Sequence, residues 1–300
     1  MTRNTRASVL VALCCAVAGA GLVGCEESKS AGSDSSPTTN AKNAEQGFPS
    51  GTKKIRVDGH AVNVSCSGRS ADGKPVTVLL HGGGDSLKKM AAFQKTLSKK
   101  GRVCSYDRLG AGASDKPAGP QTVESSGKVL TGVLDRVAGD APVVLAGHSL
   151  GGLIAARYAP DHQDKVKGLV LMDATPSTQN ADVTREVPKS ATGPAADVRD
   201  QFLAISQGKN PEKLVIKDGK VRSAGDIPVE VIKHGKKYLA AVPDSGPGLE
   251  RAWSKGQREW LKISSNSKLS TAKKSGHYIY AEQPEIAVQA VQHVVSQAAD

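Results

Sequence analysis

Residues 142–156 read Pro-Val-Val-Leu-Ala-Gly-His-Ser-Leu-Gly-Gly-Leu-Ile-Ala-Ala. The apolar run Val143–Ala146 predicts a buried strand, and Leu153–Tyr158 predicts a helix. Between them, residues 147–151 fit the pattern G-x-S-x-G, in which the glycines leave room for a strained turn. Such a turn exposes the serine hydroxyl and aims the next amide at a developing oxyanion. Ser149 is therefore the candidate nucleophile; the alternative is a serine that only caps a turn or a helix.

The rest of the chain alternates strand-like and helix-like segments, which predicts one large α/β domain over residues 53–300. We expect strands at Lys54–Val57, Ala61–Cys66, Val76–Leu80, Val103–Asp107, Val143–Ala146, Val166–Met172, Val229–Ile232 and Leu269–Ala272. We expect helices at Leu87–Lys99, Val123–Val137, Leu153–Tyr158, Leu249–Ile263 and Pro284–Gln297. Residues 176–226 are polar and irregular, with one helix expected near Ala195–Gln207.

Composition narrows the range of partners. Aromatic residues make up only 3% of the chain, so the core must be built from Val, Leu, Ile and Ala. The formal net charge of +11 is compatible with an anionic partner, but the lysines are scattered in pairs and favour a solvated surface. No nucleic-acid motif is present. The seven histidines show no H-E-x-x-H spacing, so we expect no metal.

The N-terminal residues have the pattern of an export signal. Arg3 and Arg6 precede an uncharged, mostly apolar stretch that runs to Gly24. The run ends in Leu-Val-Gly-Cys at 22–25, which resembles the bacterial lipobox, and the resemblance implies that residues 1–24 are removed and that Cys25 is lipidated. Residues 25–52 would then form a polar, disordered tether to the membrane at its extracytoplasmic face. The alternative is an uncleaved transmembrane anchor.

Four landmarks in chain order resemble the α/β-hydrolase superfamily over about residues 53–298. They are His81–Gly84, Tyr106–Ser114, the serine turn and Ser275–Tyr278. The resemblance implies an α/β-hydrolase fold with a mostly parallel central sheet, flanking helices and a small cap insertion at approximately residues 176–226. It also implies a serine esterase-like enzyme that needs no cofactor.

The resemblance implies a base and an acid for Ser149. His277 lies between the last expected strand and the last expected helix, where the general base is placed. The acid most often follows the strand at 229–232, but no acid occurs there before Asp244. Asp173 ends the preceding strand and is our first choice, with Asp244 and Glu250 as alternatives.

The family pattern also implies an oxyanion hole and a disulfide. The Leu150 amide would act with an amide of the triple glycine, of which Gly83 is the first choice; the alternative is a merely flexible turn. Cys66 and Cys104 fall on strands that are neighbours in this fold, so we expect a disulfide rather than two buried thiols.

The sequence thus predicts a lipid-anchored, extracytoplasmic serine hydrolase that acts on a small ester-like substrate through an acyl-enzyme. The polar cap favours short soluble esters over emulsified lipid. An aminopeptidase or amidase, a lactonase, a C–C bond hydrolase and a non-catalytic binding lipoprotein stay open as alternatives, because the fold does not settle the chemistry.

Overall fold

The structure is a computed structural model that describes residues 50–71 and 73–299. The expected export signal, the expected lipidation site Cys25 and nearly all of the expected tether lie outside the described residues. Within those residues no helix is both long enough and apolar enough to cross a membrane.

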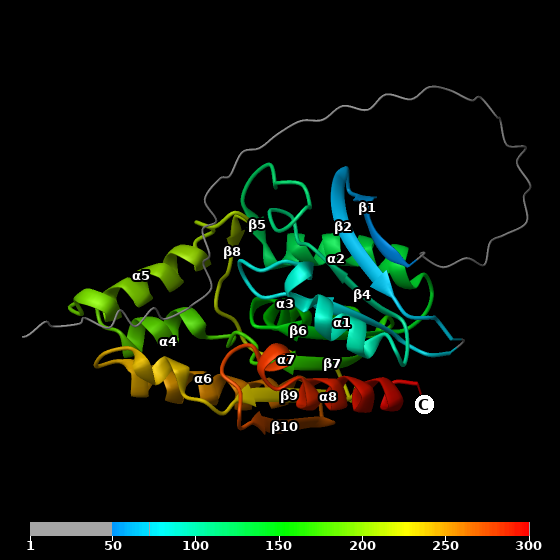
Figure 1. Cartoon of the computed structure of the whole chain (residues 1–300). Coiled ribbons are helices and arrows are strands. Elements are labelled where there is room, and N and C mark those ends of the chain that lie inside the picture. Colours follow the sequence, from blue (N-terminus) through cyan, green and yellow to red (C-terminus); the bar gives the residue numbers. More distant parts are fainter. Residues whose placement is uncertain (1–49, 72, 300) are drawn as a thin grey trace, which may run out of the picture.

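An eight-stranded sheet forms the centre of the domain (Figure 1), in the order β1-β2-β4-β3-β6-β7-β9-β10. The pairs β1–β2 and β2–β4 are antiparallel, and every other neighbouring pair is parallel. The strands span Gly51–Val57 (β1), His60–Ser67 (β2), Val76–Leu80 (β3), Val103–Tyr106 (β4), Val143–His148 (β6), Val166–Met172 (β7), Val229–His234 (β9) and Ser267–Ala272 (β10). All eight expected strands are present, and the predicted α/β-hydrolase fold is confirmed.

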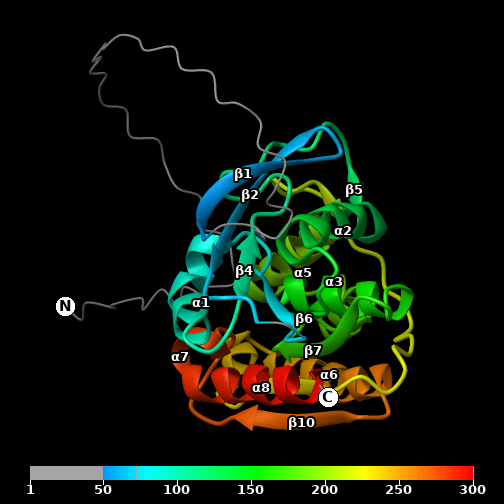
Figure 2. The ribbon, with the colours of Figure 1, turned by 90° about the vertical axis from the view of Figure 1, so that its right-hand side faces the viewer.

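Helices cover both faces of the sheet because the parallel strands are apolar on both faces. Leu79, Ala146 and Val170 face one side, where they pack with α1 (Ala91–Leu97) and α8 (Pro284–Gln297). Their strand neighbours Leu80, Leu145 and Leu169 face the other side. That side is covered by α2 (Val123–Ala138), α3 (Leu150–Tyr158) and the 3₁₀ turn η4 (Trp260–Ile263). Figure 2 shows α8 and α2 on opposite sides of the sheet. Short helical turns complete the connections at η1 (Leu87–Met90), η2 (Ala159–Asp161) and α7 (Ile279–Glu282).

Residues 176–226, here called the cap, contain two helices instead of the single one expected. The helix α5 (Gly193–Ser206) was predicted, whereas α4 (Gln179–Glu186) was not. The sequence of α4 contains only two apolar residues, Ala181 and Val183, and only Val183 is buried, so no apolar stripe marks a helix there. Asp218 accepts hydrogen bonds from the backbone amides of the first turn, at 3.0 and 2.8 Å. Tertiary contacts therefore stabilise α4.

The cap joins the main domain at two places. Apolar side chains of α4 and α5 form a small core with η3 (Tyr238–Ala241) and α6 (Gly246–Glu259). The short strand β8 (Leu214–Val215) pairs in parallel with β5 (Gln121–Thr122). These contacts hold the cap over the carboxyl ends of the central strands, where α/β proteins bind ligands.

The expected disulfide joins β2 to β4. Cys66 and Cys104 are direct partners in the antiparallel register, and their Sγ atoms are 2.03 Å apart. Both cysteines are buried. The bridge ties the antiparallel edge of the sheet to its parallel centre.

Candidate active site

The serine turn has the strained geometry that its sequence indicated. Ser149 lies between β6 and α3 with φ 49° and ψ −119°, a conformation that non-glycine residues rarely adopt. A Cβ on Gly147 would lie 2.5 Å from the backbone of Gly151, and a Cβ on Gly151 would lie 2.2 Å from the carbonyl oxygen of Leu80. Only glycine fits at both positions, and their packing keeps the turn strained. The turn holds Ser149 at the carboxyl end of the sheet.

Asp173 and His277, which are 104 residues apart, meet beside this turn. His277 Nδ1 lies 2.7 Å from Asp173 Oδ2, at hydrogen-bond distance, and the Tyr238 hydroxyl lies 3.2 Å from the same nitrogen. Asp173 has no exposed surface. Burial alone would raise the pKa of Asp173, but hydrogen bonds from His234 and His277 outweigh it and hold the pKa well below its ordinary value. Asp173 is therefore an ionised acceptor that fixes the His277 ring.

A second histidine occupies the other side of Asp173. His234 ends β9, and its Nδ1 lies 2.8 Å from Asp173 Oδ1, while its Nε2 lies 2.9 Å from Glu250 Oε2. The indole of Trp253 donates to the same Asp173 oxygen at 2.9 Å. Burial lowers the pKa of His234, but the two carboxylates outweigh burial and raise that pKa to about 9. A buried imidazolium thus bridges two carboxylates.

The three candidate acids are now placed. Asp173 contacts His277 directly. Glu250 is buried in the same network but contacts His234, so one imidazole separates it from Asp173. Asp244 is exposed just before α6, and among the described residues no hydrogen bond joins it to either histidine.

The triple glycine lies against the start of α3. A Cβ on Gly83 would lie 3.4 Å from Leu150 Cδ2, so the two residues are neighbours. Leu150 is the first residue of α3, and its amide has no acceptor within the helix. The two predicted oxyanion-hole residues therefore border one space, which is part of the pocket described below.

A buried ion pair holds the glycine loop in place. The Arg108 guanidinium donates to the carbonyl oxygens of His81 and Gly82 at 2.6 and 2.8 Å. It also makes a two-pronged pair with Glu212 of the cap, at 2.7 and 2.9 Å. Both side chains are almost fully buried. The cap thereby contributes to the shape of the loop that carries Gly83.

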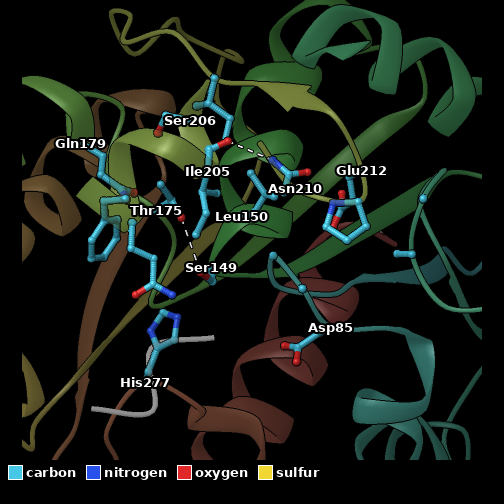
Figure 3. Close-up of a pocket in the computed structure, with 18 of the residues that line it drawn as sticks. Asp85, Ser149, Leu150, Thr175, Gln179, Ile205, Ser206, Asn210, Glu212 and His277 are labelled. Carbon is cyan, nitrogen blue, oxygen red and sulfur yellow. Dashed lines mark hydrogen bonds between the residues drawn. The ribbon is translucent and has the colours of Figure 1, made fainter. Parts of the chain in front are cut away.

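Ser149, His277, Gly83 and Leu150 all line one pocket of about 230 Å³ beneath the cap. Figure 3 shows the His277 ring and Ser149 in this pocket, with Thr175 on the side of the cap. The Ser149 hydroxyl lies 3.5 Å from the Thr175 hydroxyl. The remaining wall comes from Gly84 and Asp85, the segment 110–112, Gln179, α5 with the residues after it, Tyr238 and Trp253.

Sequence reasoning missed His234, Trp253 and the pair Arg108–Glu212. His234 had a usable signal, because it ends the strand next to the one that Asp173 follows, and side chains at neighbouring strand ends meet. Trp253 and Glu212 had none, because each comes from a helix or loop whose position depends on cap packing. No group of three or more potential metal-ligating side chains suited to a metal occurs in the part of the chain that the structure describes.

Comparison with known proteins agrees with the architecture. Residues 75–207 match the family model described as the alpha/beta hydrolase fold. The sheet order and the serine turn agree with this match, and the chain has the α/β-hydrolase fold.

Individual relatives are distant. The chain is 31% identical over 113 residues to the human (Lyso)-N-acylphosphatidylethanolamine lipase. The aligned region covers 37% of this chain and 33% of the lipase. The match therefore spans only about a third of the relative's length. A serine hydrolase involved in carbazole degradation superposes with a TM-score of 0.59 at 19% identity, over 82% of this chain and 98% of that one. An esterase from Thermogutta terrifontis does so with a TM-score of 0.58 at 18% identity, over 83% and 99%. The two structural similarities support the fold alone.

Proposed function

We propose that this protein is a serine hydrolase that cleaves carboxylic esters through an acyl-enzyme on Ser149. The supporting observation is the 2.7 Å contact between His277 Nδ1 and Asp173 Oδ2 in a pocket that also contains Ser149. A serine hydroxyl is a poor nucleophile at neutral pH unless a base removes its proton. An ionised Asp173 holds the His277 proton on Nδ1 and leaves Nε2 as that base.

The proposed reaction proceeds in two halves. Ser149 attacks the ester carbonyl while His277 Nε2 takes the hydroxyl proton, and the amides of Leu150 and Gly83 receive the oxyanion. His277 then gives the proton to the leaving alcohol, which leaves an acyl group on Ser149. Water attacks that ester with His277 again as the base, which releases the acid and restores the serine.

The pocket favours small substrates. Its volume of about 230 Å³ lies below the roughly 300–1,000 Å³ usual for drug-sized ligands. Side chains of the cap helix α5 line it together with Tyr238 and Trp253. Short soluble esters therefore fit better than long acyl chains, and we expect faster turnover of 4-nitrophenyl acetate or butyrate than of the palmitate.

A fluorophosphonate probe tests the proposal. It should label Ser149 in the wild type, and the adduct should disappear in His277→Ala. The exposed helix serine Ser296 provides a matched control, since Ser296→Ala should label normally. Folded protein that takes no label and cleaves no ester would favour a non-catalytic binding protein.

Anchoring at the outer face of a membrane belongs to the same proposal. It rests on the lipobox-like residues 22–25 and on the disulfide, since disulfides persist in oxidising compartments. Labelling of cells with a clickable fatty acid should tag the full chain, and Cys25→Ala should abolish the tag and release the protein from the membrane fraction. Equal labelling of the variant would refute lipidation at Cys25.

A further inference from the structure

The charge of the pocket differs from that of the whole chain. The chain carries 40 lysines and arginines against 29 acidic residues. Among the described residues, however, no lysine or arginine lines the pocket, whereas Asp85 and Glu212 both do. An anionic substrate group would find no cationic side chain in this wall, and would approach two carboxylates instead.

Glu212 is already neutralised. Its two carboxylate oxygens accept hydrogen bonds from Arg108 at 2.7 and 2.9 Å, and burial of the pair shields both charges from water. Its charge therefore belongs to the ion pair that holds the glycine loop, and Asp85 is the pocket carboxylate left to interact with a substrate.

Asp85 follows the glycine loop and has no such partner. Its Oδ2 is buried, and within residues 50–71 and 73–299 no group donates a hydrogen bond to it. A Cβ on Gly82 would lie 3.0 Å from this oxygen and 2.9 Å from His148 Nδ1, so the two atoms approach the same point. His148 Nε2 lies 3.0 Å from the carbonyl oxygen of His277 and must donate its proton there.

His148 therefore supplies no donor to Asp85. Burial and the neighbouring His277 hold the pKa of His148 well below its ordinary value, so the ring is neutral and Nδ1 is a second acceptor. The nearby cation Lys89 lies with its Nζ 4.7 Å from the ring centroid of Tyr278 and does not line the pocket. Burial raises the pKa of Asp85, and Lys89, His277 and Arg108 oppose that rise.

We propose that Asp85 selects esters that carry an ammonium group close to the scissile bond. The inference rests on the proposed function, because Asp85 lies only two residues beyond Gly83 of the oxyanion loop. An unbalanced carboxylate at this place destabilises the negative charge that develops on the carbonyl oxygen. A substrate ammonium in the pocket offsets that penalty through its charge, whereas a carboxylate or phosphate group adds to the repulsion. Figure 3 shows the Asp85 carboxylate on the wall of the pocket that contains Ser149 and His277.

Two pairs of esters, each pair equal in shape, test whether a positive charge on the alcohol side or on the acyl side of the scissile bond speeds cleavage. Acetylcholine and 3,3-dimethylbutyl acetate differ only by a charge on the alcohol. The 4-nitrophenyl esters of 4-trimethylammoniobutanoate and 5,5-dimethylhexanoate differ only by a charge on the acyl group. In at least one pair we expect the wild type to have about tenfold higher kcat/KM for the cation. Asp85→Asn should lose that preference, so that its kcat/KM values for the cationic and the neutral ester become equal.

Asp85→Glu, which keeps the charge, is the matched control and should retain a preference for the cation. If Asp85→Asn fails to fold, inhibition of the wild type replaces this comparison. The butyltrimethylammonium ion should then inhibit cleavage of the neutral ester more strongly than neutral alcohols of the size of 2,2-dimethylhexane do. Equal kcat/KM within both pairs, or an unchanged ratio in folded Asp85→Asn, overturns the inference. If no ester is cleaved and Ser149 takes no fluorophosphonate, the proposed function itself has failed.

Discussion

Replacing His234 by leucine should destabilise the fold strongly, and more at neutral pH than at alkaline pH. The imidazole is 5% exposed and lies between Asp173, at 2.8 Å, and Glu250, at 2.9 Å. Its removal leaves two buried carboxylates without their shared cation. Breaking a buried ion pair in this way costs about 3–5 kcal/mol of unfolding free energy.

The pH dependence gives an independent magnitude. A pKa raised from 6.5 to about 9 corresponds to roughly 3 kcal/mol of stabilisation. Because the pKa is raised in the folded state, this contribution is complete below the unfolded pKa of 6.5 and is lost as the pH rises through about 9. The free energy of unfolding of the wild type should therefore fall across this window, and that of His234→Leu should fall much less.

Urea unfolding at pH 6 and pH 9, followed by the fluorescence of the two tryptophans, measures both effects. His293→Leu is a matched control, because His293 pairs with Glu230 at 2.8 Å but is 43% exposed, and surface pairs contribute little. The double variant His234→Leu with Glu250→Leu should recover much of the loss, since it removes one of the stranded carboxylates. A His234→Leu protein as stable as the wild type at pH 6, with the same pH slope, would refute the charged bridge.

Three further outcomes are expected. Asp173→Asn should lower kcat for 4-nitrophenyl acetate by about 10⁴, because the His277 ring loses the acceptor that fixes its tautomer, while Asp244→Asn should leave kcat unchanged. Replacing both disulfide cysteines by serine should lower the urea midpoint by the equivalent of about 3–4 kcal/mol, given a separation of 38 residues; an unchanged midpoint would contradict this. Gly151→Ala should abolish fluorophosphonate labelling because its Cβ meets backbone at 2.2 Å, whereas Gly119→Ala has open space and should label normally.

The strands were predictable because their information is local. Val76–Leu80 and Val166–Met172 have the predicted bounds, since a short apolar run between polar turns has few ways to bury itself. The serine turn was predictable for the same reason: the glycines that allow it stand within five residues of one another. The helix α4 was missed because residues 179–186 include only two apolar side chains, too few to mark a helix face, and contacts from elsewhere stabilise it.

The acid partner of His277 was harder to predict. From the sequence, three carboxylates remained possible, and the usual position after β9 held none. In the sheet β9 lies between β7 and β10, and the loop after β10 is hydrogen-bonded to the residues that follow β9. This loop therefore carries His277 past the end of β9 to Asp173 at the end of β7. The structure also places His234 at the end of β9, where it pairs with Asp173 and not with solvent.

The sequence by itself determined the order of strands and helices along the chain and the strained serine turn. Each depends on the spacing of residues along the chain, and local sterics and burial act over that distance. Only the tertiary structure decided which acid meets His277, that a buried His234 is charged, and that Asp85 Oδ2 has no hydrogen-bond donor among the described residues, none of whose lysines or arginines lines the pocket. Those properties depend on electrostatics and burial between groups far apart in the chain, and folding alone determines how close they come.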